Sequence, residues 1–126
     1  MAVLILGPGS TNTALDRLRG PTLVNDSGSR LNGIHAINES DRPVFLQVFN
    51  EAKVGDVTLG KTIPNDIVAL PPANEFGLAG SKGENYGLNA PNYGKGIVIA
   101  ATHSSHGGDR VQAGDVFANV KYTPVG

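Results

Sequence analysis

Residues 55–62 read GDVTLGKT and match the phosphate-binding pattern GxxxxGK(S/T), in which a lysine and backbone amides hold a nucleotide phosphate. That chemistry requires the loop to follow a parallel strand and to open a helix whose N-terminal amides face the phosphates. Here residues 63–66 read IPND and lead into a second expected strand, and no βαβ pattern occurs elsewhere in the chain. We therefore expect Lys61 to be a solvated loop residue that binds no nucleotide.

A second group of chemically capable residues lies in the segment HSSHGGD, where His103, His106 and Asp109 could act as zinc ligands. Ser104 or Ser105 beside His106 also resembles part of a nucleophile and base, but no elbow motif or oxyanion arrangement accompanies them. The segment lies in a glycine-rich stretch between two expected strands, and nothing in it fixes a ligand geometry. We favour a polar loop, and the sequence leaves metal binding by this loop open.

Aromatic and amide side chains occur together in a third segment, residues 85–93, which contains Tyr86 and Tyr93 together with Asn85, Asn89 and Asn92. Sugar-binding surfaces often have this composition. The same composition is also typical of a turn-rich loop or of a subunit interface. Tyr86 and Tyr93 are therefore candidate partner-binding residues.

Composition restricts the classes of function. The chain has 126 residues, which corresponds to one domain, and 40% of them are hydrophobic. It contains no cysteine, so it has neither disulfides nor thiolate metal sites. The formal net charge is −1 and no basic cluster occurs, so nucleic acid is not an expected partner. No apolar run is long enough to span a membrane.

The strand that organises the chain is expected at residues 44–52. Both of its faces are apolar apart from Gln47, which is typical of a central strand packed on two sides. A second strand of the same sheet is expected at residues 67–70, and a hairpin partner is expected at residues 30–38. Further strands are expected at residues 22–25, 96–102 and 115–123. The predicted core includes Phe45, Val48, Phe49 and Ile99.

The first twenty residues read differently from the rest. Residues 1–6 are apolar and predict a short strand or an arm that docks on a neighbouring molecule, with Val3, Leu4, Ile5 and Leu6 as its contact residues. Residues 11–19 have weak helical character and are followed by a Gly-Pro stop. We therefore expect residues 1–20 to form an N-terminal arm with a short helix. Residues 21–126 are expected to form a compact antiparallel β-sandwich, jelly-roll-like, with about eight strands and long Gly/Pro loops.

The strand patterns resemble those of a family of small bacteriophage virion proteins. The segments concerned are SRLNGIHAIN (29–38), RPVFLQVFN (42–50), GKTIP (60–64), IVALPP (67–72) and GIVIAA (96–101). The resemblance covers roughly residues 22–122, and residues 1–20 have no counterpart in it. It implies a structural protein of the virion, and it implies no catalytic residues and no cofactor.

The resemblance leads to the expectation of a capsid decoration (cement) protein on the virion surface, and not of an enzyme. Its partner would be the major capsid protein of the assembled head. By analogy with other decorating proteins that follow the local symmetry of the shell, it would be a homotrimer. The alternative is a virion-surface module of the tail or fibre that binds host glycans through residues 85–93.

Overall fold

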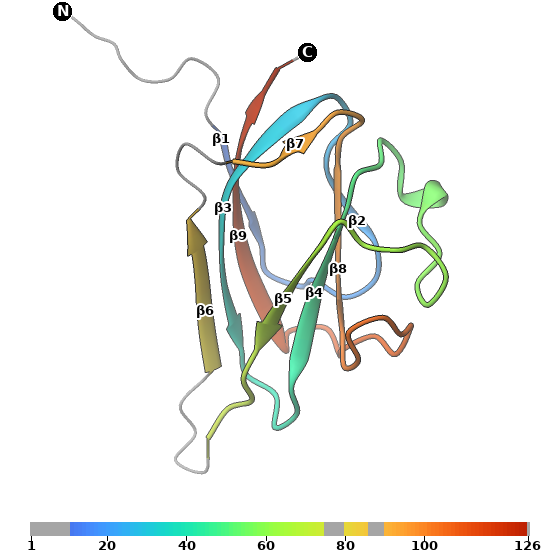
Figure 1. Cartoon of the computed structure of the whole chain (residues 1–126). Helices are drawn as coiled ribbons and strands as arrows, with labels where there is room; N and C mark the ends of the chain where they lie inside the picture. Colours follow the sequence, from blue (N-terminus) through green and yellow to red (C-terminus); the bar gives the residue numbers. More distant parts are fainter. Residues whose placement is uncertain (1–10, 75–79, 86–89, 126) are drawn as a thin grey trace, which may run out of the picture.

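The computed structural model describes residues 11–74, 80–85 and 90–125. These residues form two antiparallel sheets that face each other (Figure 1). The first sheet, in spatial order, consists of β1 (Thr11–Leu15), β9 (Val116–Pro124), β3 (Ser29–Asn38) and β6 (Gly80–Asn85), and β7 (Asn92–Tyr93) also pairs with β3. The second sheet consists of β2 (Thr22–Asn25), β8 (Ile97–Thr102), β4 (Val44–Phe49) and β5 (Asp66–Leu70).

The order of the strands is that of a jelly roll. With the short β7 set aside, strands 1-9-3-6 face strands 2-8-4-5, so the chain passes repeatedly from one sheet to the other. Among the strands that the structure describes, β4 and β5 are the only pair that is both consecutive in the chain and hydrogen-bonded to each other. The predicted all-β sandwich of jelly-roll type is therefore confirmed.

The core lies between the two sheets and is mainly aliphatic. In β4, Val44, Leu46 and Val48 are all 0% exposed and face the other sheet. In β3 the simple alternation of inward and outward residues breaks at a bulge between Leu31 and Gly33. The extra residue changes the phase of the strand, so Leu31 before the bulge and Ile34 and Ala36 after it reach the same core.

The outer face of the second sheet is also covered, by the long connection between β4 and β5. Phe49 is 1% exposed and packs with Val57, Val98 and Ala100 in a second hydrophobic cluster, which we call the outer cluster. β4 is thus packed on both sides, as predicted. Phe45, on the same face of β4, is only half-buried because it lies outside this cluster, so the prediction that it is buried is wrong.

Two local predictions are wrong. Residues 11–15 form the edge strand β1, which pairs with β9 from Thr11↔Tyr122 to Leu15↔Ala118, and not a helix. A two-turn helix is marginal alone, whereas the strand gains hydrogen bonds and the packing of Leu15 against the core. The strand at residues 30–38 does not form a hairpin with β4, because β3 and β4 belong to different sheets and residues 39–43 link them.

Candidate functional site

The segment with the phosphate-loop pattern forms a tight turn and not a nucleotide site. After the single-turn 3-10 helix η1 (Val54–Asp56), the backbone amides of Lys61 and Thr62 donate hydrogen bonds to the carbonyl of Thr58, at 3.0 and 2.8 Å. The amide of Thr58 donates to Thr62 Oγ1 at 2.8 Å, so this hydroxyl is used within the turn. The preceding strand β4 is antiparallel to its neighbours, and β5 follows at Asp66 without an intervening α-helix. Lys61 is exposed, in agreement with the expectation from the sequence.

In the HSSHGGD loop, each of the three candidate metal ligands has a different hydrogen-bond partner. His103 Nδ1 lies 3.0 Å from the carbonyl oxygen of Pro43, and His106 Nδ1 lies 2.9 Å from Ser105 Oγ. Asp109 Oδ1 accepts a hydrogen bond of 2.5 Å from Ser104 Oγ, which lowers the pKa of the Asp109 carboxyl below its usual value. Within the described part of the chain, His, Asp and Glu side chains nowhere gather in a group of three that could hold a metal ion.

A buried glutamine fixes this loop over the outer face of the second sheet. Gln47 is 0% exposed, and its Nε2 donates to Thr102 Oγ1 at 2.8 Å and to the Gly107 carbonyl at 3.1 Å. Thr102 Oγ1 in turn donates to the carbonyl of Ser104 at 2.7 Å. The one polar residue that interrupts the apolar faces of β4 is thus structural, because it satisfies the backbone of the crossing loop.

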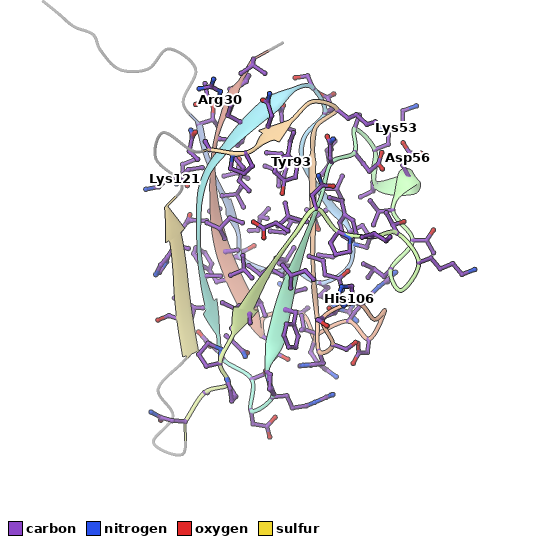
Figure 2. All side chains as sticks on the ribbon, in the orientation of Figure 1. Arg30, Lys53, Asp56, Tyr93, His106 and Lys121 are labelled. Atoms are coloured by element: carbon purple, nitrogen blue, oxygen red, sulfur yellow. The ribbon has the colours of Figure 1, made fainter. Side chains whose placement is uncertain are left out.

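Tyr93 is part of the core and does not form a binding surface. It is 1% exposed, and its side chain points into the space between the two sheets (Figure 2). Burial raises the pKa of its phenol strongly, and the negative charge of Asp66 adds to the increase. The prediction of Tyr93 as a partner-binding residue is therefore wrong, because β7 pairs with β3 and places the ring inside. Tyr86 lies outside the described residues.

Large apolar side chains are exposed at four described positions. Leu23 is 41% exposed, Val54 is 40%, Val125 is 55% and Ile63 is 81%. Leu23 and Val54 belong to one open pocket between the edge strand β2 and the connection after β4, which we call the β2 pocket. Its lining residues are Leu23, Asp26, Ala52, Lys53, Val54 and Gly55. This pocket could not be predicted from the sequence, because it lies beside the edge of a sheet. β2 takes that edge position only through its pairing with β8, which is distant in the chain.

The β2 pocket is near the end of the sandwich where the chain begins and ends. Thr11 pairs with Tyr122, and the amide of Val125 donates to the carbonyl of Gly28, directly before β3, at 2.9 Å. Figure 1 shows that β1 starts and β9 finishes at this same end. The candidate contact residues Val3, Leu4, Ile5 and Leu6 lie outside the described residues. They are covalently attached to this end through Thr11.

The lining of the β2 pocket contains one acidic and one basic side chain, Asp26 and Lys53. Lys53 and Asp56 extend from the region of η1 at the edge of the molecule (Figure 2). Lys95 and Glu51 form an ion pair at 3.8 Å, and the Lys95 side chain is largely exposed, so this pair contributes little stability. The pocket therefore offers an apolar floor without a strong electrostatic preference.

The chain matches no protein-family model and no curated protein. In residues 11–74, 80–85 and 90–125 there is no helix of the length and apolar character that a membrane crossing would need.

Proposed function

We propose that this protein decorates the assembled head of a bacteriophage and reinforces its shell. The segments that resemble phage virion proteins coincide with β3, β4, β5 and β8, so the resemblance extends over both sheets of the sandwich. Jelly rolls are used by viral capsid domains and by lectins, and the fold is therefore compatible with this role. Because one fold serves many functions, the proposal also needs a surface that could adhere to a shell.

The observation that carries the proposal is the pair of exposed aliphatic side chains in the β2 pocket, Leu23 and Val54. Val125 is also exposed, directly after β9, at the end of the sandwich where β1 starts, and the apolar residues 1–6 are attached at that end. Exposed apolar surface concentrated in one region is typical of a protein–protein contact. Burying it stabilises the complex by roughly 25 cal/mol per Å² of apolar surface, before the cost of association.

The mechanism would be adhesion. A protein that binds the assembled shell, and not the separate capsid subunits, shifts the equilibrium towards the assembled state by its binding free energy. The partners would be the major capsid protein and further copies of the decoration protein. The glycan-binding alternative required an aromatic surface formed by Tyr86 and Tyr93, and the burial of Tyr93 removes one of these two rings from the surface.

Co-sedimentation tests the proposal. Purified protein is added to phage heads that lack it, and in parallel to unassembled capsid subunits. We expect saturable binding to the heads, weak binding to the free subunits, and a higher temperature of head disruption. Heads that neither bind the protein nor become more heat-resistant would contradict the proposed function.

A further inference from the structure

The β2 pocket is an apolar acceptor surface beside an edge strand. Leu23 and Val54 each keep about two-fifths of their surface exposed, at 41% and 40%, and Ala52 and Gly55 complete the apolar lining. β2 pairs with β8 on one side and stands at the edge of its sheet. Such an edge can accept an extended segment, which gains main-chain hydrogen bonds while its side chains enter the pocket.

The chain itself contains a segment that fits this surface. Residues 2–6 read AVLIL, which are five aliphatic residues in succession, and three of them (Leu4, Ile5 and Leu6) have large apolar side chains. When extended, five residues span roughly 17 Å, which is comparable to a short edge strand. The inward residues of the sandwich are already buried by one another, nearly all at 0–3% exposure, so the core offers no place for this run.

The length of the link favours docking on another molecule. Residues 7–10 (GPGS) connect the run to Thr11 in β1 and span at most about 14 Å. β1 belongs to the first sheet, whereas Leu23 faces the outer side of the second sheet, and packed sheets are about 10 Å apart. To reach the pocket of the same chain, this short link would have to cross from the first sheet, pass around the edge of β2 and end on the outer face of the second sheet. The pocket of a second copy imposes no such restriction.

We propose that the β2 pocket binds residues 2–6 of a second copy of this chain. Each copy gives one segment and receives one, so the contact closes as a reciprocal pair or as a ring. This inference concerns self-association and does not depend on the proposed binding to a phage head.

Sedimentation velocity over a range of concentrations tests the inference. We expect the full chain to associate, and deletion of residues 2–6 to give a monomer. Val54→Asp places a charge in the pocket and should weaken association by about tenfold or more. Ile63→Asp is the matched control, because Ile63 is an exposed aliphatic residue outside the pocket, and it should associate like the unchanged chain. Circular dichroism confirms that each variant keeps its β-structure.

A full chain that is monomeric at all concentrations would overturn the inference. Equal association of the Val54→Asp and Ile63→Asp proteins would do the same. If the deletion protein does not fold, the comparison of Val54→Asp with Ile63→Asp still tests the inference. Both side chains are solvent-exposed, so neither substitution should prevent folding.

Disulfide trapping distinguishes a second copy from the same chain, and the absence of native cysteine makes it unambiguous. The double variant Ile5→Cys/Val54→Cys should form covalent multimers on mild oxidation, more than the control Ile5→Cys/Ile63→Cys. A product that is only a monomer with an internal disulfide would overturn docking between copies. A protein that is monomeric in solution but still coats phage heads would contradict self-association and leave the proposed function standing. A protein that self-associates but does not coat heads would contradict only the proposed function.

Discussion

Replacing Phe49 by alanine tests the most specific structural claim, that the outer face of the second sheet carries its own packed cluster. Phe49 is 1% exposed and is enclosed by Val57, Val98 and Ala100, with Leu59 partly buried against them. Phe49→Ala should therefore cost about 3–5 kcal/mol of unfolding free energy, as large-to-small aromatic substitutions in cores do. For a domain of this size, that loss corresponds to a decrease in Tm of roughly 10–20 °C.

The matched control is Phe45→Ala, because Phe45 lies on the same face of β4 but is only half-buried. It should cost about 1–2 kcal/mol, since less apolar surface is lost from the packed state. Calorimetry gives both Tm values. Hydrogen exchange should also show faster exchange of the Lys61 and Thr62 amides in Phe49→Ala, because their turn is held down by this cluster. Equal Tm values for the two variants, with unchanged exchange in the turn, would show that the outer cluster is not a packed core of its own.

Two further substitutions test the loops over this face. Lys61→Ala should change the unfolding free energy by less than about 0.5 kcal/mol. Titration calorimetry with magnesium-ATP should show no heat of binding for the unchanged chain or for the variant. Micromolar ATP binding by the unchanged chain that is lost in Lys61→Ala would contradict the assignment of this segment as a turn. Ser104→Ala should raise the pKa of the Asp109 carboxyl in an NMR titration, because the Ser104 hydroxyl is the main cause of its lowering. A carboxyl whose pKa is lower in the folded state stabilises the fold at pH values above its unfolded-state pKa, and this stabilisation is lost as the pH falls through the folded-state pKa. The unfolding free energy of Ser104→Ala should therefore decrease less on acidification than that of the unchanged chain. An unchanged pKa of Asp109 in the variant would argue against the hydrogen bond.

Strand positions could be read from local patterns, but strand partners could not. The apolar runs predicted β4, β5 and β8 to within a few residues, and Val48 and Ile99 are buried as expected. The pairing of β3 with β9, and not with β4, depends on contacts far apart in the chain. β1 was missed for the same reason, because its partner β9 lies about a hundred residues away.

The candidate site was predictable only in part. The rejection of the phosphate-loop pattern followed from its context and agrees with the turn that residues 58–62 form. The burial of Tyr93 was hidden, because a polar, asparagine-rich surrounding gives no sign that a two-residue strand will place its ring in the core. The exposure of Leu23 and Val54 was equally hidden, since hydropathy alone cannot tell an edge strand or a loop from the interior.

If the chain decorates a phage head as proposed, a cryo-EM map of the virion that contains it is the most direct test. We expect jelly-roll density at symmetry-related positions on the outside of the head, with the β2 pocket, which contains Leu23 and Val54, facing the shell or neighbouring copies. Heads that carry no such density, or density of this shape only on the tail or its fibres, would contradict the proposed function.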